Sequence, residues 1–213
     1  DEFKEKQTAA FSERGVRVTS LDVAHGTLPE ATVAAVIEEA DIVLVSGGNT
    51  LFAVDRWRRV NLVEPLRRAM EHGTVLCGGS AGAGCWFDAL HSDSMDPMTY
   101  RAAFGASSDE AAAAAKGQQA ASWEYIRVPG LGFLPGLLCP HHDRFQSNGV
   151  LRAHDFDAML ARHPAETGIA IDHFGALVIS EGRYEVLSLE GKPGSVSPDG
   201  KLSLAAGPDQ PAT

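Results

Sequence analysis

The sequence predicts an α/β fold, in which a mostly parallel sheet is flanked by helices on both faces to form a three-layer sandwich. The first half of the chain alternates between segments of helical and strand-like period, which is the pattern of a parallel sheet covered by helices. Two apolar runs end in glycine-rich turns that lead into helices, where such sheets bind ligands. The length of 213 residues, with 44% hydrophobic and 22% charged residues, fits one domain with a sizeable core.

Helical and strand-like segments can be placed in order through the amino-terminal half. Gly15 is a reasonable stop for the first helix, and Pro29 suits the first turn of the second, where its missing N–H does no harm. In chain order we expect a helix over residues 2–14, a strand at Val16–Leu21, a helix over 28–40 with Thr27 as its N-cap, a strand at Ile42–Val45, a helix from Leu51, a helix over 63–72 and a strand at Thr74–Cys77.

A change of composition interrupts this pattern at residues 92–122. The stretch combines Asp, Ser, Met and Pro with an alanine run, which is typical of a surface insertion. After it we expect a helix near 149–163 and short strands at Tyr125–Val128, Leu137–Cys139, Gly168–Ile171, Ala176–Ile179 and Tyr184–Leu187. The predicted organisation is one α/β domain over residues 1–192, followed by a C-terminal strand or loop and tail over 193–213.

Charge and composition exclude several classes of partner. The formal net charge of −10 comes without a basic run, so we expect neither nucleic acid nor an anionic membrane as a partner. No apolar run reaches the roughly 20 residues of a membrane helix, and the first residues lack the apolar core of a signal peptide. Three cysteines without a C-x-x-C pair argue against a disulfide framework. We expect a cytoplasmic protein that is a monomer or a homodimer.

The residue that most strongly indicates chemistry is Ser80, at the centre of Gly78-Gly79-Ser80-Ala81-Gly82. A nucleophilic serine must project clear of the backbone, and small neighbours permit the strained strand-to-helix turn that achieves this. The amide of Ala81 would then point at a developing oxyanion, with Gly48 at the neighbouring strand end as the second donor. The alternative interpretation is a glycine-rich turn without chemistry, in a chain that holds 22 glycines.

A serine nucleophile also needs a base and a group that orients the base. Of eight histidines, His141 is the best placed, because it follows a predicted strand and lies in a polar cluster with His142 and Asp143. A pair of surface histidines is the alternative. Asp172, which closes another predicted strand, and Asp93 are the two candidate orienting acids.

Metal catalysis and cofactor chemistry find little support in the sequence. His141, His142 and Asp143 are adjacent and cannot all converge on one ion without a fourth group. There is no H-E-x-x-H motif and no cysteine quartet. We therefore expect no metal site and no cofactor.

Several motifs in a fixed order extend the pattern around Ser80. They are Gly47-Gly48-Asn49-Thr50, Gly79-Ser80-Ala81-Gly82-Ala83, Leu131-Gly132-Phe133-Leu134-Pro135-Gly136, Pro140-His141 and Gly168-Ile169-Ala170-Ile171-Asp172. With these motifs the chain resembles the peptidase E (aspartyl dipeptidase) family of serine peptidases, to which cyanophycinase is related. The resemblance runs from about Ile42 to Leu187. It implies a fold like that of class I glutamine amidotransferases, with serine in place of the cysteine nucleophile.

The resemblance also implies a role for each matching residue. Ser80 would be the nucleophile, His141 the base, Asp172 the acid, and Gly48 and Ala81 the oxyanion donors. Asp93 matches another acid proposed in the family. Asn49 and Arg152 would bind substrate, and Arg152 would pair with the carboxylate of an amino-terminal aspartate, because guanidinium and carboxylate pair through two hydrogen bonds. The substrate implied is a short peptide, in particular a dipeptide that begins with Asp.

Two other functions remain open at the level of sequence. An esterase or amidase with the α/β-hydrolase order of nucleophile, acid and histidine would use His173 as its base. A non-catalytic module would use the two glycine turns to hold an anion at helix N-termini, with Ser80 only donating a hydrogen bond.

Overall fold

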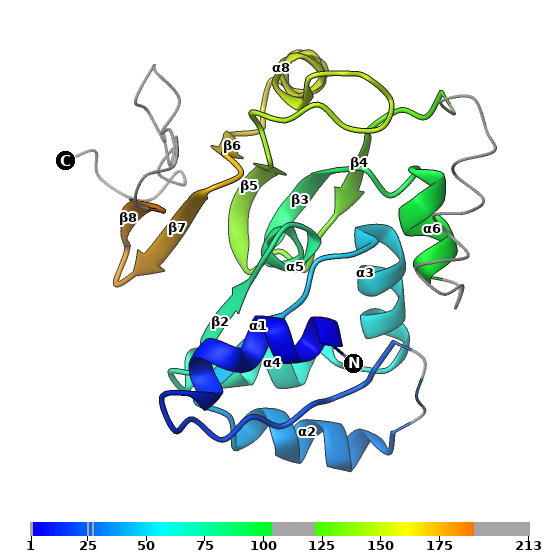
Figure 1. Ribbon diagram of the computed structural model, residues 1–213. Coiled ribbons are helices and arrows are strands. Elements are labelled where there is room, and N and C mark those ends of the chain that lie inside the picture. The colour runs from blue at the N-terminus through cyan, green and yellow to red at the C-terminus, as the bar shows by residue number, and fades with distance from the viewer. Residues whose placement is uncertain (1, 25, 27, 104–121, 190–213) are drawn as a thin grey trace.

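The computed structural model describes residues 2–24, 26, 28–103 and 122–189, which form an α/β structure (Figure 1). The described helices are α1 (Glu2–Ser12), α2 (Glu30–Glu38), α3 (Thr50–Arg59), α4 (Val63–Glu71), α5 (Ala81–Gly84), α6 (Pro97–Ala103) and α8 (Arg152–Arg162). The described strands are β1 (Ile42–Val45), β2 (Val75–Gly78), β3 (Phe87–Ser92), β4 (Ile126–Pro129), β5 (Leu134–Pro140), β6 (Gly168–Ile171), β7 (Gly175–Ser180) and β8 (Arg183–Ser188). None of the described helices is long and apolar enough to span a membrane.

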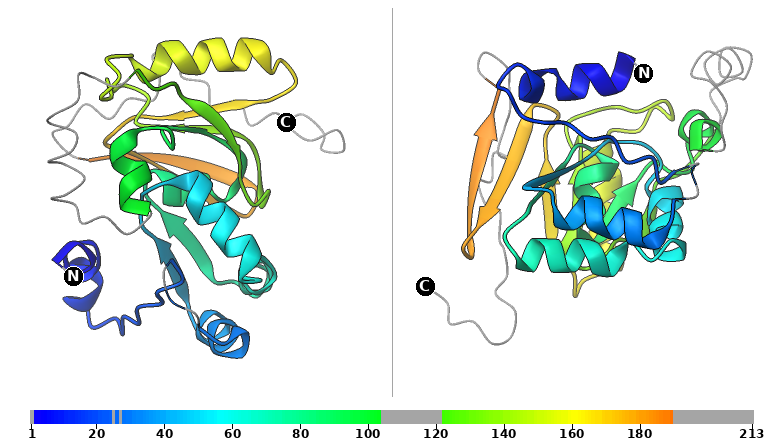
Figure 2. Two further views of the ribbon diagram at one scale, coloured as in Figure 1. Left: turned by 90° about the vertical axis from the view of Figure 1, so that its right-hand side faces the viewer. Right: turned by 90° about the horizontal axis from the view of Figure 1, so that it is seen from below.

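The strands form three hydrogen-bonded groups. β1 and β2 are parallel, with Val45 opposite Gly78. The central group has the order β4-β3-β5-β6, in which β3, β5 and β6 are parallel and β4 is antiparallel. β7 and β8 form an antiparallel hairpin. Helix α8 lies over one face of the central group and α3 and α5 lie toward the other (Figure 2), so the predicted arrangement of mostly parallel strands between helices is confirmed.

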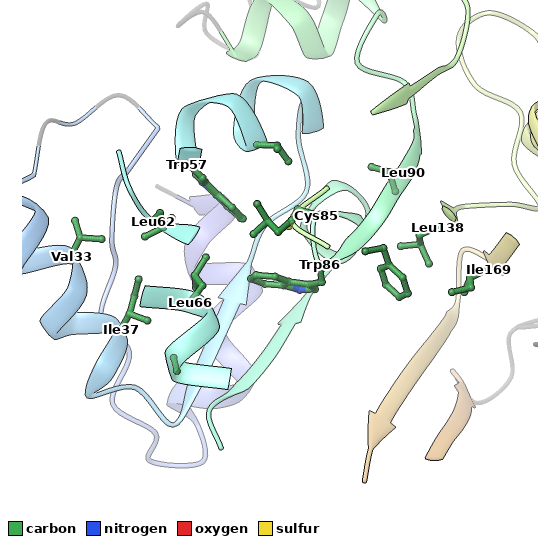
Figure 3. Packing of buried hydrophobic residues seen from close by; sticks show 14 residues of the cluster. Val33, Ile37, Trp57, Leu62, Leu66, Cys85, Trp86, Leu90, Leu138 and Ile169 are labelled. Atoms are coloured by element: carbon green, nitrogen blue, oxygen red, sulfur yellow. The ribbon is translucent and has the colours of Figure 1, made fainter. Parts of the chain in front are cut away.

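Alternate residues of the central strands supply two separate hydrophobic clusters. Leu137 of β5 packs with Phe156 and Met159 of α8 on one face. The next residue, Leu138, belongs to the cluster on the opposite face, which includes Trp57 of α3 and Trp86 (Figure 3). Successive side chains of a strand point to opposite faces. A strand that is covered by helices on both faces therefore has a continuous run of apolar residues in its sequence.

Three expectations from the sequence differ from the structure. Residues 16–21 are extended but pair with no described strand, because a β-branched run forms a strand only where a partner edge is available. β3 at Phe87–Ser92 was missed, since it begins directly after the short helix α5. The stretch interpreted as a surface insertion begins inside the protein, where Ser92, Ser94 and Asp96 are buried. Its residues 104–121, Thr27 and the tail over 193–213 lie outside the described residues.

A core substitution on β5 tests the two-layer packing. Leu138 is 0% exposed, so Leu138→Ala removes buried methyl groups and leaves a cavity, which should lower the free energy of unfolding by about 2–5 kcal/mol. Leu51, which is 46% exposed, provides the matched control, and Leu51→Ala should change the free energy by less than about 0.5 kcal/mol. Urea unfolding measures both values. Similar small losses in the two variants would contradict the packing described.

Candidate active site

Most of the candidate residues from the sequence follow the carboxyl ends of strands, whereas Arg152 is the first residue of α8. β1 leads to Gly48 and Asn49, β2 to Ser80, β3 to Asp93, β5 to His141 and β6 to Asp172. Open α/β sheets bind ligands at these strand ends, because loops and helix N-termini gather there. The fold therefore places residues from distant parts of the sequence at the strand ends, where a site is expected.

Ser80 occupies a strained turn between β2 and α5. Its φ is 53° and its ψ is −118°, a conformation that costs a residue with a side chain of order 1–3 kcal/mol. The flanking glycines make room for this turn. A Cβ atom on Gly82 would lie 2.2 Å from the carbonyl oxygen of Val45, and a Cβ atom on Gly78 would lie 2.5 Å from the carbonyl carbon of Gly82. The half-buried Ser80 side chain is thus presented by a backbone that only small neighbours allow.

The glycine turn after β1 lies against the turn of Ser80. A Cβ atom on Gly47 would be 3.3 Å from Cβ of Ser80, and Gly48 has a φ of +151°, which favours glycine. Among the hydrogen bonds of the described residues, none uses the amide nitrogen of Gly48 or Ala81 as donor. Gly48 is exposed whereas Ala81 is 5% exposed, and the predicted role of the two amides as oxyanion donors remains a prediction.

Asn49 holds the glycine turn in place. Its side-chain oxygen accepts a hydrogen bond of 3.0 Å from the amide of Phe52 and so caps α3. Its side-chain nitrogen donates to the carbonyl oxygen of Ser94 at 2.9 Å. The predicted substrate-binding role of Asn49 remains a prediction, because the described contacts of the side chain are to the protein itself.

His141 follows β5 and makes its closest polar contact with another histidine. Its φ of 52° lies in the left-handed region, and its Nδ1 atom lies 2.9 Å from Nδ1 of His173. Burial, followed by the positive charges of Arg152 and His173, lowers the pKa of His141. No hydrogen bond in the described part of the chain joins Ser80 to His141, and such catalytic hydrogen bonds often tighten only when substrate is bound.

Asp172 lies beside a different histidine from the one expected. The carboxyl group is 7% exposed, and its Oδ1 atom is 3.6 Å from Nδ1 of His142. The amide of His142 donates to the carbonyl oxygen of Ile171 at 3.1 Å, which continues the pairing of β5 and β6. The structure thus places Asp172 against His142, the neighbour in sequence of the predicted base, and the predicted orienting role of Asp172 remains a prediction.

Arg152 belongs to a buried polar network between β3 and α8. Its guanidinium is 1% exposed and lies 3.3 Å from Oδ2 of Asp93. Its Nε atom donates to Nδ1 of His91 at 3.3 Å, and Nη2 donates to the carbonyl oxygen of His91 at 2.5 Å. The second nitrogen of His91 lies 2.8 Å from Oδ1 of Asp155. Asp93 is therefore paired with Arg152, the arginine that is predicted to bind the carboxylate of the substrate.

The network fixes the protonation of His91. Because the Nε–H of Arg152 can only donate, Nδ1 of His91 accepts and Nε2 carries the proton donated to Asp155. Burial lowers the pKa of His91 to about 4, so the ring is neutral at pH 7. This network could not be predicted from the sequence, since no local pattern distinguishes a buried His91 or Asp155 from exposed ones.

Stability should depend on pH through His91. The pKa is about 4 in the folded protein and about 6.5 in the unfolded chain, so the unfolded state binds the additional proton between these values. As pH falls from about 6.5 to about 4, stability should decrease by up to about 3 kcal/mol from this group. His91→Gln lacks the titrating ring and should lose less stability over the same window in urea unfolding. An identical pH dependence in the two proteins would contradict this assignment.

Comparisons with known proteins extend across most of the chain. The model of peptidase family S51 matches residues 1–187. Peptidase E of Haemophilus influenzae is 29% identical over 106 residues, covering 50% of this chain and 46% of that protein. A Trypanosoma brucei brucei protein named G2/mitotic-specific cyclin-1 is 31% identical over 207 residues, covering 90% of this chain and 61% of that protein. The chain thus spans less than two thirds of these relatives.

A solved structure supports the fold independently of close sequence similarity. The crystal structure of a candidate peptidase E protein from Listeria monocytogenes EGD-e superposes with a TM-score of 0.55 at 18% identity, covering 87% of this chain and 77% of that one. The predicted class I glutamine amidotransferase-like fold is confirmed by this likeness. The family match and the order of motifs at the strand ends agree with it, and the chain belongs to peptidase family S51.

Proposed function

We propose that this protein is a serine peptidase that hydrolyses short peptides through an acyl-enzyme at Ser80. The observation that carries the proposal is the strained turn of Ser80, with φ of 53°, enclosed by glycines whose positions leave no room for a Cβ atom. Such strain persists where function requires a particular presentation of a side chain. Membership in peptidase family S51 supports the same conclusion.

The arrangement supports a mechanism of acyl transfer. His141 takes the proton of the Ser80 hydroxyl on Nε2, and the serine oxygen attacks the peptide carbonyl carbon. The amides of Gly48 and Ala81 stabilise the negative charge on the carbonyl oxygen. His141 then gives its proton to the leaving amine, and a water molecule hydrolyses the acyl-enzyme by the same steps. Asp172, which lies near the base, is the acid implied by the family resemblance.

The cysteines support serine as the nucleophile. Cys85 and Cys139 are buried free thiols, and burial raises the pKa of each to about 12. Burial also raises the pKa of Cys77. The thiolate is the reactive form of cysteine, so none of these groups is suited to attack at pH 7. Three free thiols also accord with the cytoplasmic location that forms part of the proposal.

Arg152 supports a preference for peptides that begin with aspartate. Its guanidinium is buried, but the Asp93 side chain paired with it is 18% exposed, so solvent reaches the pair from the side of Asp93. A substrate carboxylate that approaches from there would share the guanidinium with Asp93. A guanidinium pairs with a carboxylate through charge-assisted hydrogen bonds, which are stronger than those it makes to a neutral amide.

Labelling and substitution test the nucleophile. A serine-reactive phosphonate should form an adduct at Ser80, detected by peptide mass spectrometry, because the activated hydroxyl is the attacking group. Ser80→Ala should lose the adduct and reduce kcat by at least about 10³-fold. Ser12→Ala, at the exposed end of α1, is the control and should behave as the unaltered protein. Full turnover by Ser80→Ala would rule out the proposal, and anion binding without any adduct would favour the non-catalytic module.

A dipeptide series tests the substrate. Asp-Leu should be cleaved with a kcat/KM at least about tenfold above that of Asn-Leu and Ala-Leu, since loss of one charged hydrogen-bonding partner costs more than about 1.4 kcal/mol. Asp93→Asn should lower KM for Asp-Leu more than for Ala-Leu, because the competing carboxylate is gone. Equal rates for Asp-Leu and Asn-Leu would contradict aspartate specificity. An equal fall in kcat for all peptides would instead make Asp93 the orienting acid.

A further inference from the structure

We propose that His173 is the positioning residue of His141, accepting its Nδ1–H and thereby holding Nε2 toward the proton of Ser80. The proposal deepens the function proposed above and rests on His141 as the base. In this proposal the imidazole of His173 orients the base, a role that the family resemblance implies for the carboxylate of Asp172. It also differs from the α/β-hydrolase alternative, in which His173 would itself be the base.

The geometry of the pair requires one shared proton. The two Nδ1 atoms are 2.9 Å apart, and the ring centroids are separated by 4.9 Å with an interplanar angle of 41°. At that distance one nitrogen donates and the other accepts. A base that acts through Nε2 carries its own proton on Nδ1, so His141 is the donor. His173 accepts on Nδ1 and carries its proton on Nε2, on an exposed side chain.

Neighbouring groups hold the ring of His173. Its backbone amide donates to Oδ1 of Asp143 at 2.8 Å. Its ring meets the ring of Phe174 edge to face, with centroids 4.6 Å apart. The guanidinium of Arg144 lies 5.5 Å from the centroid of the Phe174 ring, and the amide of Gly175 closes the turn on the carbonyl oxygen of Asp172 at 3.0 Å. The partner of His141 thus has its backbone held by Asp143 and its ring packed against Phe174.

The register of β5 and β6 explains why the histidine, and not the aspartate, meets the base. Pro140 pairs with Ile171, so the residues that follow both strands start level with each other. At the turn that follows β6, Asp172 is buried against His142, whereas His173, the next residue, is exposed and lies beside His141.

In the proposed proton transfers, His173 neither gains nor loses a proton. The proton of the Ser80 hydroxyl moves to Nε2 of His141 and later to the leaving amine. While His141 is an imidazolium, its Nδ1–H makes a charge-assisted hydrogen bond to the neutral His173 ring, which is stronger than the neutral one. A protonated His173 has no lone pair on Nδ1 and cannot accept, so the arrangement works only while His173 is neutral.

The charges around His141 determine the sign of a pH effect. The groups that face it are Arg152 of α8 and His173 of the β6–β7 turn, which lower its pKa, and Asp93 after β3 and Asp143 after β5, which raise it. Replacing His173 with glutamine keeps an acceptor but removes a positive charge at low pH, and therefore raises the pKa of His141. Removing a carboxylate that orients His141 has the opposite effect, because a nearby negative charge favours the imidazolium.

The experiment compares His173→Gln, His173→Leu and Asp172→Asn by the pH dependence of kcat and kcat/KM for dipeptide hydrolysis. His173→Leu has no acceptor and should reduce kcat about 10–100-fold with KM within about twofold. His173→Gln offers an amide oxygen, so it should recover most of kcat. In His173→Gln, which keeps an acceptor and loses the charge, the acidic limb of kcat/KM should move to higher pH. His154→Leu, on the exposed side of α8, should change neither quantity.

The opposite pattern overturns the inference. If Asp172 orients His141, Asp172→Asn should reduce kcat by up to about 10⁴-fold and move the limb to lower pH, while the His173 variants behave as the unaltered protein. Circular dichroism verifies that each variant is folded. If Ser80 does not react in the phosphonate assay, the proposed function itself is contradicted. If Ser80 is labelled and the His173 variants are unchanged, only the role of His173 is contradicted.

A spectroscopic measurement tests the pair without turnover. In protein labelled with ¹⁵N-histidine, nuclear magnetic resonance should find His141 protonated at Nδ1 and His173 protonated at Nε2 at neutral pH. A neutral His141 that carries its proton on Nε2 would contradict the proposal, because that tautomer cannot act as the base toward Ser80.

Discussion

The site depends on one steric constraint, the close approach of the first turn of α5 to the end of β1. Gly82 lies so near Val45 that an added Cβ atom would be 2.2 Å from the carbonyl oxygen. The parallel register of β1 and β2 brings Val45 level with Gly78, so the two glycine turns meet there. Because no side chain fits at this contact, α5 must begin directly after Ser80. The strain of Ser80 is then maintained by the packing around it.

A second set of interactions connects the strand ends with α8. Arg152 at the first residue of α8 reaches the end of β3 through His91 and Asp93, and Asp155 one turn later accepts from the other side of His91. Breaking such a buried network leaves charges without compensation, which costs about 3–5 kcal/mol. The position of α8, and with it the loop that carries His141, is thus coupled to β3. Polar contacts position α8 relative to β3, as apolar packing positions elements elsewhere in the domain.

The sequence predicted those parts of the structure that local patterns determine. β1, β2 and β6 are short aliphatic runs bounded by turn residues, and the turn of Ser80 requires glycines that are visible in the sequence. β3 escaped prediction because its polar residues, including His91 and Ser92, are buried by tertiary contacts. The strand expected at 16–21 has the right propensity but no partner. The orienting group was equally hidden, since Asp172 and His173 are adjacent and only the three-dimensional backbone determines which one meets His141.

The adjacency of these two residues has an evolutionary consequence. A carboxylate and an imidazole stand side by side after β6, where the chain turns toward β7. A shift of this turn by one residue, through a single insertion or deletion, would change the group beside His141, while the nucleophile and base stay in place.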